Sequence, residues 1–466
     1  MKKLLARLDL SYLYALLGEA TLALTFVFYI TIARVLGPEQ YGIFAAAIAL
    51  AAILSLFIQF GLPTLMNREV AAHPDEAPQS TVLFLVLEGL TSIGVLIILL
   101  PLALILGYTD ETLIVCYLAV FSEICRAAIM TLRGTIKGLG WFRTESIAVA
   151  IERLAVVAIA STVLFQTKSL ILVIATVVIV RAINTIGLVY YLSRQVKIWS
   201  SINRQKLVNT LKIAYPFALS GVLWILYYQV DVVMLKSLST GEETGLYSAA
   251  YRILEIFSAL PRVIFYVIFT RFSRYYTTEP EKLPEQIYKG ARLLVGAVLP
   301  AIVIAGFLQA WLVELLYGEA FLAAVKPLAI LIPSLSIKMF GSLSEEFLVA
   351  TKHEKKLPFI LLGAALTNVA INSVLIPQMG AVGAALATLF SEVILCLIGL
   401  WMLRRIGYDY IGKYVSLIAA ISLTIAAVPS LILNGMTVSV GIAILIPCSI
   451  ILLILMQRNR FLARVN

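Results

Sequence analysis

The chain has 466 residues, of which 61% are hydrophobic and 13% are charged. This composition leaves too little polar surface for a water-soluble domain, so we expect a lipid bilayer to be its solvent. The formal net charge of +10 collects in the breaks between apolar runs, which is typical of a membrane protein and gives little support to a nucleic-acid partner.

Apolar runs long enough to cross a bilayer as helices follow one another along the whole chain. They are too long for the strands of a membrane β-barrel and lack the alternation of such strands. We therefore predict an all-α polytopic membrane protein with about 14 transmembrane helices. In chain order, the predicted helices centre on Leu22, Ala52, Gly94, Val120, Val156, Val177, Leu223, Ile256, Ile302, Ile332, Ala365, Phe390, Leu423 and Leu445.

Lysine and arginine gather in every second break between these helices, and cytoplasmic loops collect such residues. The opposite breaks hold only Arg34, Lys168, Lys236 and Lys326. This asymmetry predicts a multi-pass protein of the plasma (inner) membrane whose N- and C-termini are both cytoplasmic.

A short pattern occurs twice, as GPEQYGIFAA at residues 37–46 and as GEETGLYSAA at residues 241–250. Each copy lies between the first and second helices of one half, so the pattern indicates two parallel repeats. The alternative is that both are merely tight outer turns in which glycine supplies unusual dihedral angles. The repeats divide the chain into an N-lobe (1–195), a cytoplasmic linker (196–212), a C-lobe (213–405) and a final segment (406–466) with two helices and a tail.

Several motifs along the chain resemble those of one family of transporters. They are IARVLGPEQYG at 32–42, GL at 61–62, NREVA at 67–71, DVVML at 231–235, GLYSAAYR at 245–252, LYGEAF at 316–321 and GAVGAA at 380–385, the last preceded by Asn368, Asn372 and Pro377. In combination they resemble the Wzx-type oligosaccharide flippases of the multidrug/oligosaccharidyl-lipid/polysaccharide (MOP) superfamily, to which the MATE exporters also belong. The resemblance implies two six-helix lobes around a central cavity, with two further helices here.

The resemblance also implies a function. A flippase of this kind moves a polyprenyl-pyrophosphate-linked oligosaccharide from the cytoplasmic to the outer leaflet by alternating access, for polysaccharide biosynthesis. Its expected partners are this lipid-linked oligosaccharide, the membrane lipids, and the polysaccharide polymerase and glycosyltransferases of the same pathway. The alternative is a MATE-like exporter of drugs or organic cations coupled to H+ or Na+. We expect no enzyme activity and no cofactor, because no HExxH, GxSxG or Walker A pattern occurs.

Cations within the predicted spans are the candidates for binding the pyrophosphate, because a charge at mid-membrane costs about 2.5–3.5 kcal/mol or more and needs a reason to be there. Arg252, Glu255 and Arg262 fall on one face of a predicted helix, and similar lipid II flippases carry a cavity arginine where Arg252 lies. Structural ion pairs, such as one between Arg252 and Glu255, are the alternative. The full candidate set for the substrate is Arg126, Arg153, Arg181, Trp224, Tyr228, Arg252, Glu255 and Arg262.

The sequence contains no nucleotide-binding motif, so the expected drive is the membrane potential or a gradient of H+ or Na+. A candidate Na+ site, similar in spacing to one in lipid II flippases, comprises Asp231, Asn368, Asn372, Ala384 and Thr388. Asn372 replaces a carboxylate of that site, and interhelical hydrogen bonding is the alternative role for these residues. Two isolated mid-span carboxylates, Glu19 and Glu88, are candidates for proton relay, with Glu19 preferred.

Overall fold

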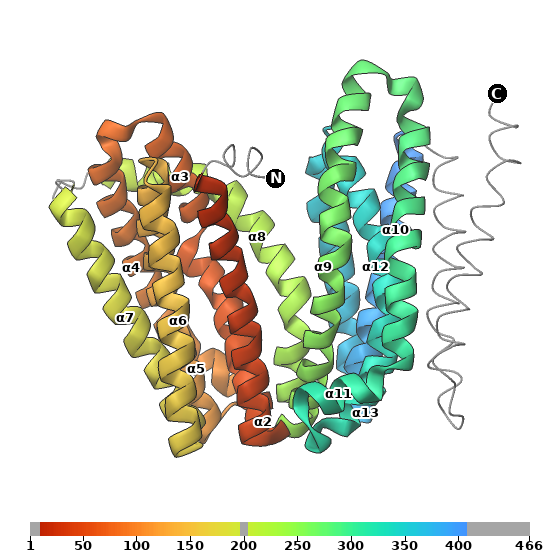
Figure 1. Ribbon diagram of the computed structural model, residues 1–466, viewed down its shortest axis with the longest axis horizontal. Helices are drawn as coiled ribbons and strands as arrows, with labels where there is room; N and C mark the ends of the chain where they lie inside the picture. Colours follow the sequence, from red (N-terminus) through yellow and green to blue (C-terminus); the bar gives the residue numbers. More distant parts are fainter. Residues whose placement is uncertain (1–9, 196–203, 408–466) are drawn as a thin grey trace, which may run out of the picture. The chain divides into compact units, whose positions relative to one another are not determined.

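The computed structural model describes residues 10–195 and 204–407, and in parts of four helices it describes the backbone only (Figure 1). All regular secondary structure in these residues is helical, which confirms the predicted all-α polytopic fold. The helices of the first half are α2 (Leu10–Gln59), α3 (Leu62–Ala72), α4 (Ala77–Ile105), α5 (Asp110–Gly138), α6 (Phe142–Thr167), α7 (Leu170–Gln195) and α8 (Arg204–Leu238). Those of the second half are α9 (Gly241–Thr278), α10 (Leu283–Phe307), α11 (Gln309–Tyr317), α12 (Val325–Ala350) and α13 (Leu357–Arg405).

The first twelve predicted spans all fall on helices of the structure. Helices α2 and α13 hold two spans each, while α4 to α10 and α12 hold one each. The last two predicted spans, centred on Leu423 and Leu445, lie outside the described residues. Short 3-10 turns, such as η1 (Pro74–Glu76), complete several of the connections.

Helices α2 and α13 each pass through a glycine that breaks the helical path. Gly37 has φ 79° and ψ 176°, and Gly380 has φ 53° and ψ −128°. Only glycine adopts such angles without steric cost. Each helix is therefore a hairpin of two spans joined without a loop.

The two copies of the repeated pattern differ at this point. The first copy turns at Gly37, as a tight turn requires. In the second, neither Gly241 nor Gly245 has a positive φ; instead Thr240 caps α9, and its side-chain oxygen accepts a hydrogen bond from the amide of Glu243 at 3.2 Å. A hydroxyl cap is a common start for a helix, so similar sequences reach similar turns by different backbone paths.

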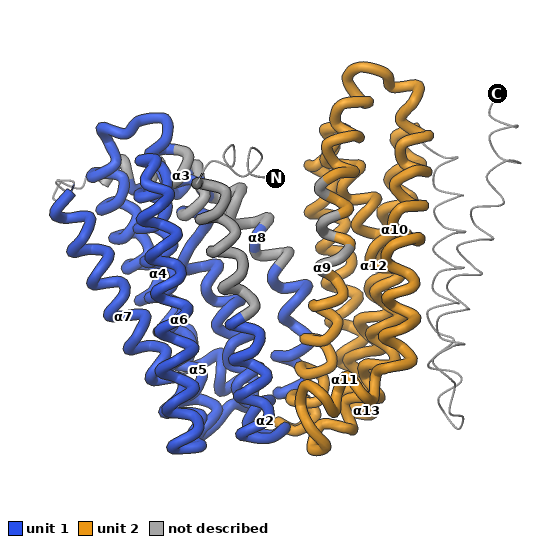
Figure 2. Tube along the Cα trace, in the orientation of Figure 1, with its two compact units in different colours: residues 1–237 blue, residues 238–466 orange. Residues whose placement is uncertain are grey.

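By internal contacts the chain divides into two compact units, Met1–Ser237 and Leu238–Asn466 (Figure 2). In the first unit, α2 packs against α5 and α6, and α7 packs against α5 and α6 as well. In the second unit, α12 packs against α13 and α9, and α10 packs against α9 and α12. The four segments that we predict from the sequence remain a prediction.

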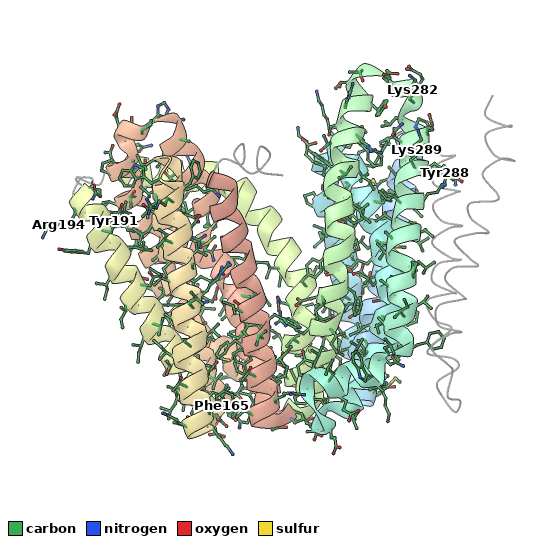
Figure 3. All side chains as sticks on the ribbon, viewed as in Figure 1. Phe165, Tyr191, Arg194, Lys282, Tyr288 and Lys289 are labelled. Carbon is green, nitrogen blue, oxygen red and sulfur yellow. The ribbon has the colours of Figure 1, made fainter. Side chains whose placement is uncertain are left out.

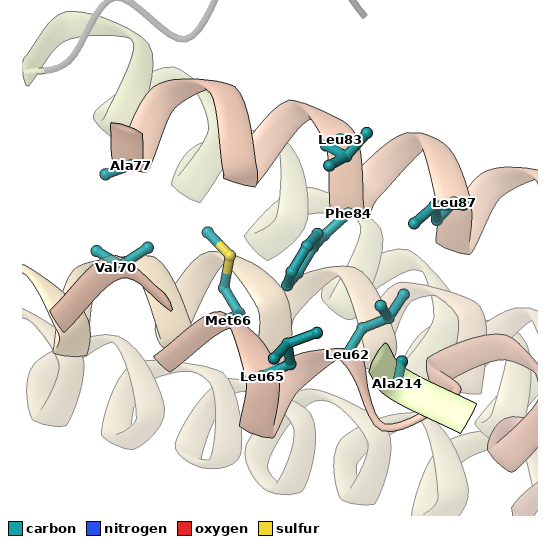
Figure 4. Packing of buried hydrophobic residues seen from close by; sticks show 9 residues of the cluster. All are labelled: Leu62, Leu65, Met66, Val70, Ala77, Leu83, Phe84, Leu87 and Ala214. Carbon is teal, nitrogen blue, oxygen red and sulfur yellow. The ribbon is translucent and has the colours of Figure 1, made fainter. Parts of the chain in front are cut away.

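Helix α3 was not predicted as a separate element, and it forms an apolar cluster at one end of the first unit (Figure 4). Its buried side chains pack against α4 and against Ala214 of α8. Val70 of α3 lies so close to α5 that a Cβ added to Gly138 would be 2.7 Å from the Val70 Cβ. The NREVA motif therefore includes a residue that fixes α3 against α5. The cluster consists of Leu62, Leu65, Met66, Val70, Ala77, Leu83, Phe84, Leu87 and Ala214.

The outward faces of several helices carry large apolar side chains. Ile97 of α4 and Ile186 of α7 are each 69% exposed. Among the described residues, eight helical segments are long and apolar enough to cross a membrane. Contiguous apolar surface of this kind belongs against lipid acyl chains rather than water.

Charged and aromatic side chains mark one end of each unit (Figure 3). In the first unit, the Arg194 guanidinium lies 5.3 Å from the centre of the Tyr190 ring, while Phe165 lies at the opposite end. In the second unit, Arg292 lies over Tyr288 at 5.8 Å, near Lys282 and Lys289. Aromatic rings and long basic side chains are typical of the membrane interface.

Candidate functional site

A cavity of about 260 Å³ lies inside the first unit, among helices α2, α5, α6 and α7. Most of its wall is apolar, as expected within membrane-spanning helices. Its polar wall is unusual because it holds four arginines. We call this cavity the arginine cavity. These polar residues are Ser122, Glu123, Arg126, Arg133, Glu152, Arg153 and Arg181.

Arg126 and Glu123 form an ion pair within one helix. Their spacing of three residues on α5 places them on one face, and the Arg126 Nε lies 2.6 Å from the Glu123 Oε2. The Glu123 side chain is 12% exposed and the Arg126 side chain 34%. The pairing that the sequence offered as an alternative role is therefore present, and the same arginine also faces the cavity.

Arg181 connects three helices across the cavity wall. From α7 its Nη1 donates to the Ser122 hydroxyl at 2.7 Å and lies 3.4 Å from the Glu123 Oε1, both on α5. Its Nε lies 3.6 Å from the Glu152 Oε1 on α6. A guanidinium presents its donors in a rigid fork, which suits one side chain to several acceptors. Arg181 thus holds α5, α6 and α7 together beside the cavity.

Arg133 is the cavity arginine that our candidate set does not include. Helix α5 continues to Gly138, and Arg133 lies within it. Its Nη2 contacts the Glu145 Oε1 of α6 at 2.6 Å, and its side chain reaches the cavity wall. The helical spacing of seven residues from Arg126 was the signal that could have placed both on one face.

The arginine cavity is rich in guanidinium groups. Among the described side chains, its wall carries four arginines and two carboxylates, Glu123 and Glu152, and a third carboxylate, Glu145, pairs with Arg133 from outside the wall. Phe28, Tyr29 and Phe44 supply an aromatic side, with the Tyr29 and Phe44 rings edge to face at 5.2 Å. Guanidinium groups bind phosphate oxygens in pairs, and aromatic faces pack against sugar rings. The wall is therefore chemically suited to an anion that carries a ring.

The second group of predicted substrate residues lies on α8 and α9. Arg252 pairs with Glu255 at 2.7 Å, and their side chains are 32% and 42% exposed, so the ion pair that we named as the alternative forms. The Tyr228 ring packs edge to face on Tyr227 at 5.2 Å. The predicted residues Arg262 and Trp224, and Glu19 on α2, lie outside the side chains that the structure describes.

The candidate Na+ residues divide between the two units. Asp231 is buried on α8 in the first unit, whereas the other four lie on α13 in the second, so their assembly into one site remains a prediction. Within α13, the Asn372 amide donates to the Asn368 Oδ1 at 2.8 Å. This hydrogen bond lies within one helix, so it is not the interhelical hydrogen bonding that we named as the alternative.

Thr388 and Ala384, the remaining members of that set, are already engaged. The Thr388 hydroxyl donates to the Ala384 carbonyl at 3.0 Å and lies 2.9 Å from the Tyr247 hydroxyl of α9. Both oxygens are therefore held in place by α9 and α13. Among the described residues, no group of three or more His, Cys, Asp or Glu side chains is arranged to hold a metal ion.

A separate charged cluster lies inside the second unit. The Lys338 Nζ of α12 is 3.4 Å from the Glu392 Oε1 of α13, and the Glu392 side chain is only 3% exposed. Glu345 shares the helix face of Lys338, because it lies seven residues further along α12. Glu345 lies within electrostatic range of both residues, so the structure adds an interhelical partner that the helical spacing could not reveal.

Comparison with known proteins agrees with this architecture. The model of the family described as polysaccharide biosynthesis protein matches residues 11–276, more than half of the chain. The chain belongs to this family. Among curated relatives of this polysaccharide biosynthesis protein, an uncharacterized membrane protein of Methanocaldococcus jannaschii is 23% identical over 406 residues, which are 82% of this chain and 94% of the relative.

Solved structures show the fold. The lipid II flippase MurJ in an inward closed conformation has a TM-score of 0.75 at 15% identity and covers 96% of this chain and 99% of its own. An inward-facing multidrug resistance MATE family transporter of the MOP superfamily has a TM-score of 0.66 at 14% identity. The match covers 85% of this chain and 95% of the transporter. The family match agrees with the predicted resemblance, and the predicted fold is shared with these two structures.

Proposed function

We propose that this polysaccharide biosynthesis protein is a flippase that moves a polyprenyl-pyrophosphate-linked oligosaccharide from the cytoplasmic to the outer leaflet. The observation that carries the proposal is the arginine cavity, whose described wall holds four arginines inside membrane-spanning helices. Cationic side chains within a bilayer are costly and mark the path of an anionic substrate. Family membership supports the place of this activity in polysaccharide biosynthesis.

The size of the cavity indicates which part of the substrate it receives. Its volume of about 260 Å³ is below the range of roughly 300–1,000 Å³ typical of sites for drug-sized ligands. It fits a diphosphate or a single ring, but not an oligosaccharide. We assign it to the diphosphate and the first sugar, with the rest of the substrate outside it.

The charge distribution supports an orientation for the protein. Arg194 in the first unit, and Lys282 and Lys289 in the second, lie at the ends that we assign to the cytoplasm (Figure 3). We place the protein in the plasma membrane with both termini cytoplasmic. A polymerase and glycosyltransferases of the same pathway are its proposed partners, and an H+ or Na+ gradient is its proposed drive.

Reconstitution in proteoliposomes tests this function. A fluorescent polyprenyl-pyrophosphate oligosaccharide and an organic-cation dye are followed separately under imposed Na+, H+ and voltage gradients. We expect gradient-dependent movement of the lipid and none of the dye. Movement of the dye with a static lipid would instead assign the chain to MATE-like exporters, whose fold it shares.

Two arginine substitutions test the cavity itself. Arg126→Ala and Arg153→Ala should slow movement of the lipid, because each removes a cation from the cavity wall. Arg194→Ala is the matched control, since Arg194 is an exposed arginine on Tyr190 outside the cavity. Normal movement in both cavity variants at normal protein levels would exclude the cavity as the diphosphate site.

A further inference from the structure

Glu88 is a buried carboxylate in the middle of α4 that the arginine cavity does not use. Only 3% of the surface of Glu88 is exposed. The Oε1 accepts a hydrogen bond from the Thr131 hydroxyl of α5 at 2.7 Å, while the Oε2 is buried without a hydrogen-bond partner. A carboxylate held in this way lacks most of the partners that an ionised group requires in a low-dielectric setting.

Among the described side chains, the helices around Glu88 bring it no cation. On α5, the neighbouring Arg126 and Arg133 are paired with Glu123 and Glu145. On α2, the Ile58 carbonyl accepts a hydrogen bond from the Thr91 hydroxyl of α4 at 3.0 Å.

The described residues of the remaining neighbours also supply no counter-charge. The described side chains of α3 and α8 in the cluster against α4 are apolar. Of the charges described on these two helices, Glu69 and Asp231 are acidic, and neither Lys212 nor Lys236 forms an ion pair with Glu88. Within the residues described, Glu88 has a single donor and no counter-ion. Burial of an uncompensated carboxylate favours its neutral, protonated form.

A line of threonine hydroxyls runs from Glu88 toward one end of the unit. Thr131 contacts Glu88, Thr135 lies one turn further along α5 and donates to the Thr131 carbonyl at 3.2 Å, and its hydroxyl is 2.9 Å from that of Thr81 on α4. All four residues are buried. We call Thr81, Glu88, Thr131 and Thr135 the polar seam.

The outer end of the polar seam lies close to exposed residues along the chain. Thr81 is itself buried and lies in the first turns of α4, directly after η1. His73, Asp75 and Glu76 of that connection are exposed. Solvent therefore reaches the chain a few residues before Thr81.

We propose that Glu88 is a proton-binding site of this transporter and that the polar seam is its route to solvent at the η1 end. Protonation adds one proton to the Glu88 carboxylate from hydronium, releases one water and removes the negative charge. The inference rests on the proposed flippase function, for which it names H+ as a coupling ion.

Helix α5 provides the physical link between this site and the substrate. It contributes Thr131 to the polar seam and Ser122, Glu123 and Arg126 to the arginine cavity. When Glu88 loses its proton, the charged carboxylate needs water or new donors at both oxygens, which the closed α4–α5 interface does not supply. Proton occupancy therefore selects between two arrangements of α4 against α5 and, through α5, of the cavity wall.

Infrared difference spectroscopy on the full-length protein in liposomes tests the site without any substrate. We expect a protonated-carboxyl stretching band that is absent from Glu88→Gln and from Glu88→Leu, and present in Glu392→Gln. A band that persists in both Glu88 variants, or that disappears in Glu392→Gln alone, would overturn the assignment.

Deuterium exchange of the same band tests the route. Thr131→Val and Thr135→Val should slow the shift of the band in D2O, because each removes a hydroxyl from the polar seam. Thr91→Val is the matched control, since the Thr91 hydroxyl donates only to backbone carbonyls. Equal exchange rates in all three variants would exclude the seam as the route.

Transport of the fluorescent polyprenyl-pyrophosphate oligosaccharide completes the test. In Glu88→Gln we expect loss of the acceleration by an imposed pH gradient, with gradient-free movement retained. Wild-type acceleration in this variant would contradict the coupling role. If the wild-type protein moves no lipid at all, the proposed function fails, whereas the infrared band still decides whether Glu88 binds a proton.

Discussion

Glu243 of α9 accepts a hydrogen bond from the backbone amide of Ala381 in α13, with its Oε2 2.7 Å from the amide nitrogen. Ala381 follows the kink at Gly380 and begins the second span of α13. An amide at a helix start has no partner within its helix, and a carboxylate there also interacts favourably with the helix dipole. Glu243, in the second copy of the repeated pattern, thus anchors the α13 hairpin to α9.

We expect Glu243→Ala to lower the free energy of unfolding by about 1–3 kcal/mol, because the Ala381 amide would lose its acceptor in a partly buried position. Glu242→Ala is the control, since Glu242 is the exposed neighbour in the same turn. Thermal unfolding in detergent, followed by size-exclusion chromatography, measures both. Equal melting temperatures for the two variants would show that the hydrogen bond contributes nothing to stability.

Gly383→Ala should be strongly destabilising, by about 1–3 kcal/mol or more. A Cβ at this position would lie 2.4 Å from the Leu375 carbonyl oxygen, where the two spans of α13 approach each other. Because the clash is with backbone, no rotamer change relieves it. Gly296→Ala on α10 meets no atom within 4 Å and should be neutral or slightly stabilising. Similar melting temperatures in both variants would contradict the close approach.

Arg181→Ala should lower the free energy of unfolding of the first unit by about 1–3 kcal/mol. This loss is smaller than the loss on breaking a fully buried ion pair, because the Arg181 side chain is 21% exposed. The loss removes the partner that Glu123 and Glu152 share. Arg181→Lys should fall between wild type and alanine, since one ammonium cannot reproduce the fork. Denaturation monitored by tryptophan fluorescence measures the order, and a lysine variant less stable than alanine would contradict it.

Lys338→Met should cost about 3 kcal/mol of stability, because it leaves Glu392 buried without its cation. The double variant Lys338→Met/Glu392→Leu should recover much of this loss, since no charge then remains at the pair. Lys326→Met, an exposed lysine on the same helix, is the control. A double variant that is as unstable as the two single losses added together would show that the pair is not coupled.

Arg252→Ala should slow movement of the polyprenyl-pyrophosphate oligosaccharide while changing stability by only about 0.2–1 kcal/mol, the usual range for partly exposed pairs such as Arg252–Glu255. Lys289→Ala breaks a comparable pair with Glu285, at 2.7 Å and half exposed, and should leave transport unchanged. Normal transport by Arg252→Ala at normal protein levels would mean that Arg252 makes no essential contact with the phosphates.

The sequence predicted the spans well because each depends on local composition. The same applies to the pair of Glu123 and Arg126, whose spacing along one helix places them together whatever surrounds them. Arg153 and Arg181 were also identifiable, since a charge within an apolar run has few roles other than pairing or binding. Local rules were sufficient in each case.

Contacts between helices were not predictable in this way. Lys338 contacts Glu392 on another helix, although its own helix offered Glu345 at a suitable spacing. Arg133 was left out of the candidate set because the end of a helix is poorly marked in sequence. The hydrogen bond from Thr131 to Glu88 depends on how α4 and α5 pack, which neither helix specifies alone.

The loop-free turns at Gly37 and Gly380 make both hairpins intolerant of changes in chain length. An ordinary loop absorbs an extra residue, but here a single insertion after the glycine would rotate every following side chain by about 100° around the helix axis. In α2, that rotation would turn Phe44 away from Tyr29 and the arginine cavity, and in α13 it would turn Thr388 away from Tyr247. Natural variants of this protein are therefore expected to place insertions and deletions elsewhere, and an affinity tag inserted at either glycine should abolish transport even if the protein reaches the membrane.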